Sequence, residues 1–484
     1  MRNREFQYLP NPFISMTFII ALIFYYFQAL PLFSFPDVGW HLMAGKQIVN
    51  SGHIPTTDSW SYSANGYYWY NIAWLWDIAI YYINKSIGSD GLFFVVCCLF
   101  SLLLALLCNN LLHRKEITKE VVVVVLFIVL LGLKDFVSAR AYIPSLFIII
   151  AYHAILHKSR NNLKILLWLP ILMVPWVNTH GSFLGGFVII GAYIIEAYLN
   201  KNTKWLFWLI LISLLCALAT IINPYGIYIY EATYRTLQGT IEPYINEWSP
   251  FTFSSNLGVT LFVSVFLLVS GLNRKDIPLA EKIIAYSWLF VSLYSKRHFP
   301  TAMLLSAPYL AICLKDMGKP RPLPDLSDKI LRLKIFTFAS ICLILMSTAP
   351  IRQYIAGKSR VTNPDTIEVA TINYMQANLF DKRILNDYDY GGIIIYYSDG
   401  NLPVFIDGRA STAYPKEVIE ETINIFTLDE DWLKIIEKYN IQAAVFSNMS
   451  PITKFYESGQ LKNNWKRVYK GKNASVFTIG QDKK

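Results

Sequence analysis

Two residues that could carry chemistry follow the first apolar run of the chain, one helical turn apart. Asp37 directly precedes Val38–Val49, whose pattern predicts an amphipathic helix, and His41 comes four residues after Asp37. This spacing places both side chains on the same side of a helix. The Asp37 carboxylate can act as a general base or bind a divalent metal ion, Mg or Mn, and it can also cap the helix. The sequence leaves these interpretations open and makes Asp37 and His41 the candidate catalytic residues.

Two arginines occupy loops on which positive charge is otherwise sparse. Arg140 follows the third apolar run, and Arg297 lies in the cationic cluster Lys296-Arg297-His298. A planar guanidinium group pairs with phosphate oxygens through two parallel hydrogen bonds. The alternative is that these side chains only extend to lipid headgroups. We predict that Arg140, Arg297 and His298 bind an anionic group of the substrate.

Further polar candidates lie where later apolar runs end. Asn178 and His180 belong to the segment WVNTHG, Asn223 to the segment NPYG, and Glu247 follows in the next loop. A histidine near the membrane surface can orient a phosphate or shuttle a proton, and it can equally be a hydrogen-bonded packing residue. Asn223 fits a turn as well as a substrate contact. Glu247 would help Asp37 to hold a metal ion.

The last candidates lie in the C-terminal part of the chain. Acidic residues and glycines meet at predicted strand edges in the segments Asn386–Gly392 and Asp407-Gly-Arg409. Ligands often bind at such edges of open α/β sheets. The alternative for Asp407 and Arg409 is an ion pair that fixes two loops. We count both among the candidate substrate-binding residues.

The elements that must position these residues follow from the hydropathy of the chain. Of its 484 residues, 54% are hydrophobic and only 16% are charged, whereas soluble proteins carry about 25% charged residues. Apolar runs long enough to approach the thickness of a bilayer recur through the first 350 residues. We expect about eleven transmembrane helices, at residues 13–34, 91–112, 120–137, 141–157, 163–178, 182–199, 204–222, 257–272, 278–294, 299–316 and 334–350.

The distribution of Lys and Arg sets the orientation. The segment 69–84 contains Asn71, Asp77 and several aromatic residues, which is typical of a helix lying at the membrane surface. If it does not cross, the cytoplasmic regions carry 18 Lys and Arg and the outer loops carry seven. This asymmetry predicts a cytoplasmic N-terminus and an extracytoplasmic C-terminal part. Because the net charge of +10 comes almost entirely from the membrane part, nucleic-acid binding is not supported.

Two domains are therefore expected. Residues 1–350 form the transmembrane domain, whose first outer loop, about 35–90, carries two surface-lying helices. Residues 351–484 form a small extracytoplasmic α/β domain. Its predicted strands are Ile393–Tyr397, Val404–Ile406, Ala443–Phe446 and Val476–Ile479, and its predicted helices are Lys416–Phe426 and Asp431–Tyr439.

Several motifs resemble those of a known family. They are DVGWHLMAGKQIVNSGHIPTTDSWSY from Asp37, WVNTHGSFLGG at 176–186, INPYG at 222–226 and VFIDGRA at 404–410. Together with an acidic residue after the first span, they resemble a bacterial group of GT-C-like membrane proteins. GT-C glycosyltransferases use lipid-phosphate-linked sugars, and the acidic residue serves as base or metal ligand. The sequence departs from many of them because Asp37 has no acidic neighbour and no WWD-type motif is present.

The resemblance implies a membrane glycosyltransferase of the bacterial inner membrane. It would move a sugar from a polyprenyl-phosphate-linked donor, reached from the membrane lipids, to an extracytoplasmic glycan, lipid or protein acceptor. In this hypothesis Asp37 activates the acceptor, while Arg297, Arg140 and His180 stabilise the departing lipid phosphate. The alternatives are a transporter or flippase of a lipid-linked substrate and a ligase or polymerase of surface polysaccharide.

Overall fold

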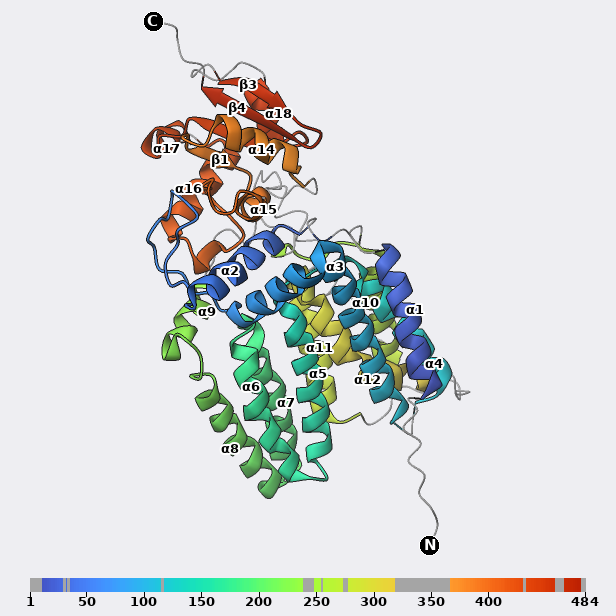
Figure 1. Cartoon of the computed structure of the whole chain (residues 1–484). Helices are drawn as coiled ribbons and strands as arrows, with labels where there is room; N and C mark the ends of the chain where they lie inside the picture. The colour runs from blue at the N-terminus through green and yellow to red at the C-terminus, as the bar shows by residue number, and fades with distance from the viewer. Residues whose placement is uncertain are drawn as a thin grey trace, which may run out of the picture.

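The computed structural model consists of a helical bundle with a small α/β module at one end (Figure 1). It describes residues 11–28, 32, 35–114, 117–237, 248–253, 256–272, 277–317, 366–429, 432–457 and 465–479. Glu247 and the expected span 334–350 lie outside these ranges. The bundle forms two apolar cores, one around α1, α3, α4 and α10–α12 and the other around α5–α8.

The helices of the bundle follow the apolar runs of the sequence. Their bounds are α1 Pro12–Gln28, α3 Trp74–Leu112, α4 Lys119–Leu133, α5 Tyr142–Ser159, α6 Trp168–Val177, α7 Leu184–Leu199, α8 Thr203–Ala219, α9 Ile229–Leu237, α10 Leu257–Leu272, α11 Leu279–Tyr294 and α12 Phe299–Met317. Large apolar side chains such as Phe207, Leu214 and Leu218 of α8 are exposed. A lipid bilayer would solvate such a surface, and a helix satisfies its own backbone groups there.

Helices occupy ten of the eleven expected spans, and the eleventh is the undescribed segment 334–350. Within the described residues, two helical stretches are long and apolar enough to cross a membrane, Trp74–Leu112 and Gly181–Leu199. Other apolar helices, such as α1 and α8, are shorter. The number of spans therefore stays a prediction.

Two helices of the first outer loop lie across the end of the bundle beneath the C-terminal module (Figure 1). They are α2, Asp37–Ser51, which agrees with the predicted amphipathic helix, and the first part of α3. The backbone of α3 departs from helical geometry at Gly88, where φ is 73°, and the helix then turns into the bundle. Asn84 Nδ2 donates to the hydroxyl of Tyr396 at 3.1 Å, so the segment 74–84 and the C-terminal module lie at the same end of the helical bundle.

The C-terminal module contains a four-stranded mixed sheet in the order β1-β2-β4-β3, in which β1 and β2 are parallel and the other pairs antiparallel. Its strands are β1 Ile384–Asn386, β2 Ala443–Ser447, β3 Trp465–Lys470 and β4 Ala474–Ile479. Its helices are α14 Val369–Asn378, α15 Gly391–Tyr397, α16 Lys416–Thr427, α17 Trp432–Lys438 and α18 Pro451–Glu457.

Two of the predicted strands are wrong. Ile393–Tyr397, whose β-branched run favours a strand, forms helix α15, because packing of this segment on α2 overrides its local propensity. Val404 pairs with Ser61 of the first outer loop in an isolated bridge instead of joining the sheet. The sheet instead uses β1 and β3, whose short or largely exposed sequences carry little strand signal.

The module and the first outer loop share one hydrophobic core. Trp40, Trp60 and Trp69 of the loop belong to the same buried cluster as the strands and helices of the module. The backbones of α2 and α15 touch, because a Cβ on Gly39 would overlap the carbonyl oxygen of Gly392. Glycine at both positions is what allows the two backbones to touch.

We predict that Gly39→Ala separates α2 from the module. The added methyl group would meet backbone atoms, which cannot move aside as a flexible side chain can, so we expect a destabilisation of about 1–3 kcal/mol. Thermal unfolding of the purified protein in detergent measures it. Gly191→Ala in α7 is the control, because a Cβ there meets nothing within 4 Å. Equal unfolding midpoints for the two variants would contradict the close contact.

Candidate functional site

The carboxylate of Asp37 lies where three segments of the chain meet. Asp37 is the first residue of α2 and follows the N-cap residue, Pro36. It forms an ion pair with Arg140 and accepts a hydrogen bond from Trp40 Nε1 at 3.2 Å. Gly408 lies so close to the carboxylate that a Cβ there would overlap Asp37 Oδ1. These contacts hold the Asp37 carboxylate at the first turn of α2, and its catalytic role stays a prediction.

His41 does not share these contacts with Asp37. Its Nδ1 lies 2.6 Å from Asp77 Oδ1, and both residues are buried. Asn71 Nδ2 donates to the other oxygen of Asp77 at 2.8 Å. The imidazole also stacks on Trp40, with ring centroids 3.6 Å apart. His41 thus links α2 to α3 and supports the indole of Trp40, which holds Asp37. His41 therefore has a positioning role.

His180 lies among positive charges in the connection between α6 and the short helix Gly181–Phe183. Burial, and then the charges of Arg297, Arg140, His41 and His298, lower the pKa of His180 to about 3. Nδ1 accepts the backbone N–H of Ser182 at 3.1 Å, so the ring proton sits on Nε2. His180 is therefore neutral at pH 7 and presents an Nε2–H donor.

Arg297 is held in a defined place before α12. It belongs to the short helix Lys296–His298, and its guanidinium lies 4.0 Å from the ring centroid of Trp248. The backbone N–H of Lys296 donates to the carbonyl of Ser249 at 3.2 Å. The electrostatic effect of both Arg297 and Arg140 on His180 brings these residues into one group with Asp37. A cationic group that already contains one carboxylate is suited to a further anion.

Two predicted substrate contacts are engaged in backbone structure. Asn178 Nδ2 donates to the carbonyls of Val174 and Ile222 at 2.8 Å, and its Oδ1 accepts from Trp74 Nε1 at 2.9 Å. Asn223 Nδ2 donates to Thr220 and Gly226 carbonyls. These contacts tie α6, α8 and α3 together and favour the turn interpretation of Asn223.

Arg409 is fully enclosed. Its guanidinium contacts Asp407 and Asp58 at 2.6 Å. It also packs against the neighbouring rings of Trp60 and Trp69, each centroid 4.8 Å away. Tyr414 donates to Asp407 at 2.6 Å. This arrangement favours the predicted alternative, in which Asp407 and Arg409 form an ion pair that fixes loops. Through Asp58, the ion pair also includes the first outer loop.

Sequence reasoning assigned no role to Asp58, Trp60 and Trp69, and it used Asp77 only as a sign of a surface-lying helix. An acidic residue followed by WSY in the first outer loop is a weak signal by itself. Its partner Arg409 lies about 350 residues away, so a single sequence offers no pattern that joins them.

The donor set does not fit a divalent cation. Within the described residues, no group of three or more His, Cys, Asp and Glu side chains could hold a metal ion. The carboxylate of Asp37 is paired with Arg140, and Arg297 adds positive charge nearby. A cation would be repelled there unless other ligands changed the balance. The chemistry below is therefore derived without a metal.

The fold is similar to that of solved oligosaccharyltransferase structures. The Archaeoglobus fulgidus oligosaccharyltransferase tethered to an acceptor peptide superposes with a TM-score of 0.60 and 14% identity, over 98% of this chain and 74% of that chain. The archaeal oligosaccharyltransferase AglB from the same organism, in complex with an inhibitory peptide and a dolichol-phosphate, gives 0.59 and 13%, over 92% and 70%. The chain therefore shares the fold of these oligosaccharyltransferase structures. No protein-family model and no curated protein matches the sequence.

We predict that His180 makes the protein less stable in mild acid. Because the pKa of His180 is lowered in the fold, the unfolded chain binds more protons between about pH 3 and 6.5, and stability falls as pH drops below about 6.5. Asn at position 180 keeps an acceptor for the Ser182 N–H but does not titrate.

The measurement is the thermal unfolding midpoint of wild type and His180→Asn in detergent from pH 7.5 to 5. We expect the wild type to lose more stability than the variant over this range. Parallel curves would show that His180 is not held neutral by burial and the surrounding cations.

Proposed function

We propose that this chain is a membrane glycosyltransferase that moves a sugar from a polyprenyl-phosphate donor to an extracytoplasmic glycan, lipid or protein acceptor. What carries the proposal is the ion pair of Asp37 with Arg140, together with the charges of Arg140 and Arg297 that act on His180. A base and an anion-stabilising group are the two parts that such a transfer requires.

Asp37 is the proposed general base. The acceptor hydroxyl attacks the anomeric carbon, the bond from that carbon to the phosphate oxygen breaks, and the hydroxyl proton passes to the Asp37 carboxylate. Trp40 and Arg140 hold this carboxylate, and Gly408 packs directly against it, where a larger residue would overlap Oδ1. A direct displacement of this kind inverts the anomeric centre.

Arg297 and His180 are the proposed partners of the departing lipid phosphate. That group leaves as an anion, so it needs charge stabilisation more than a proton. Arg297 supplies a fixed positive charge and a planar fork of donors. The Nε2–H of His180 adds a neutral donor that does not require protonation at pH 7. Arg140 adds positive charge and at the same time orients Asp37.

The fold supports a donor that arrives from the bilayer. The related oligosaccharyltransferase was solved with a dolichol-phosphate, a polyprenyl phosphate. In this proposal the donor phosphate lies at the end of the bundle that carries α2, and the C-terminal module faces the extracytoplasmic side. The charge asymmetry of the loops supports this orientation in a bacterial inner membrane.

We predict that Asp37→Asn lowers transfer by about 10²–10⁴-fold, the range expected for loss of a general base, while the protein stays folded.

We also predict that Arg297→Lys weakens use of the donor about tenfold, since lysine lacks the planar fork that binds a phosphate. Arg140→Lys should have a smaller effect, because lysine at that position still places a positive charge beside Asp37. The measurement is transfer rate against polyprenyl-phosphate-sugar concentration in nanodiscs.

Arg467→Lys on the exposed strand β3 is the matched control and should behave as wild type. Transfer by Asp37→Asn at the wild-type rate would remove Asp37 from the reaction. If wild type binds and moves the lipid-linked sugar across the membrane without transferring it, the transporter alternative replaces this proposal.

A further inference from the structure

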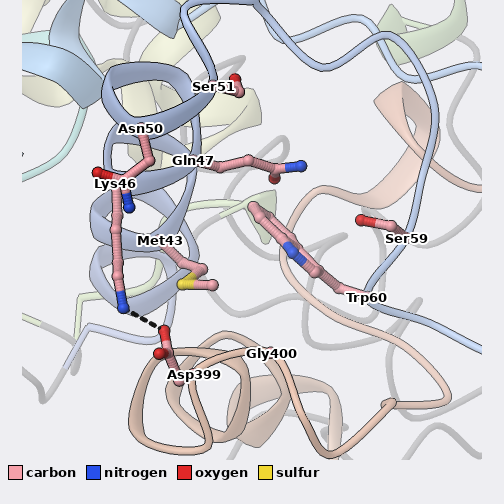
Figure 2. A pocket seen from close by; sticks show the side chains of 9 residues that line it. All are labelled: Met43, Lys46, Gln47, Asn50, Ser51, Ser59, Trp60, Asp399 and Gly400. Carbon is pink, nitrogen blue, oxygen red and sulfur yellow. Dashed lines mark hydrogen bonds and ion pairs between the residues drawn. The ribbon is translucent and has the colours of Figure 1, made fainter.

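A polar cleft opens between α2 and the C-terminal module, outside the group around Asp37. It has a volume of about 520 Å³, within the range of small-molecule sites. Figure 2 shows Gln47 and Asn50 on one side of it, on α2, and Ser59 and Trp60 on the first outer loop. Gly400, at the end of α15, completes the rim.

Several polar groups of this cleft have no protein partner. The buried Oε1 of Gln47 makes no hydrogen bond. Within the part of the chain that the structure describes, the side chains of Asn50 and Ser59 make none either. Asn50 and Ser59 are exposed, so water satisfies them when no ligand is bound, whereas a buried group such as Gln47 Oε1 is normally satisfied by the protein. A cleft lined by two amides and a hydroxyl suits a ligand that offers both donors and acceptors.

The charges at the cleft cancel. Lys46 Nζ lies 2.5 Å from Asp399 Oδ1, so the cation on α2 is neutralised by the carboxylate at the end of α15 (Figure 2). The cleft therefore favours a neutral ligand over a phosphate or an amine. This separates it from the cationic group around Arg297.

One wall of the cleft is apolar and firmly held. Trp60 packs against Trp69, with ring centroids 5.2 Å apart, and Arg409 lies over its ring. Met43 lies on the opposite side, on α2. Trp60 is only 4% exposed, so the apolar contact that it offers a ligand is small and Met43 adds to it, while the hydroxyls of a sugar ring can reach the amides. Extended peptides, in contrast, commonly add to a free strand edge, and the cleft is lined by a helix, a loop and a turn.

We propose that this cleft binds a neutral oligosaccharide, the acceptor of the transfer. The proposal rests on the glycosyltransferase function proposed above. Gln47 lies ten residues along α2 from Asp37, or about 15 Å at the rise of an α-helix. The cleft therefore accommodates sugars several units away from the end that reacts, and it selects for an uncharged glycan chain.

The experiment is direct binding, without donor, of the full chain in nanodiscs to a panel of neutral hexose oligosaccharides. Uronic-acid oligosaccharides and a neutral peptide of similar length are included for comparison. The Kd of the tightest neutral binder is then measured by thermophoresis for Gln47→Ala and Asn50→Ala. Asn373→Ala, an exposed asparagine on α14, is the control.

We expect neutral oligosaccharides to bind and each cleft variant to weaken binding about 3–10-fold, the loss of one or two hydrogen bonds, with an unchanged unfolding midpoint. Unchanged Kd in both variants, or binding of only the acidic sugars or the peptide, would overturn the inference. Because no donor is present, the result is independent of transfer. If both variants transfer sugar with a normal KM for the acceptor, the cleft does not bind the acceptor. That result would leave the glycosyltransferase proposal unaffected.

Discussion

The buried guanidinium of Arg409 is the contact on which the arrangement of this molecule depends. A charge removed from water must be paired, and here Asp407 comes from its own loop while Asp58 comes from the first outer loop. The neighbouring rings of Trp60 and Trp69 both pack against it. Removal of one member of such a group leaves a buried charge uncompensated, at a cost of about 3–5 kcal/mol. The pair thus fastens the C-terminal module to the first outer loop.

The Arg409 ion pair also fixes the surroundings of Asp37, because a glycine of the same loop packs against this carboxylate. Gly408, between Asp407 and Arg409, lies against the Asp37 carboxylate, and Gly39 of α2 touches Gly392 of α15. On the other side, His41 and Asp77 hold α2 on α3. The position of the carboxylate is therefore set by residues that take no part in proton transfer. The same fastening forms the cleft, since its walls come from both partners.

Much of the bundle could be predicted from the sequence, because apolar runs and charge asymmetry are local properties. The sequence assigned Asp37, Arg140, His180 and Arg297 to one set of loops, and whether they form one site stays a prediction. The helix at Ile393–Tyr397 and the Asp58–Arg409 pair could not be predicted. Both depend on contacts between the first outer loop and residues more than 300 positions later, and periodicity within a segment does not report such contacts.

The central claim is that one group of residues binds the lipid phosphate beside a carboxylate that activates the acceptor. The most direct measurement is an experimental structure in nanodiscs with a non-cleavable polyprenyl-phosphonate sugar. Our account predicts the phosphonate within hydrogen-bond distance of Arg297 and His180 Nε2, with the anomeric carbon facing Asp37. A phosphonate bound away from Arg297 and His180, with Asp37 still enclosed by Arg140 and Trp40, would contradict it.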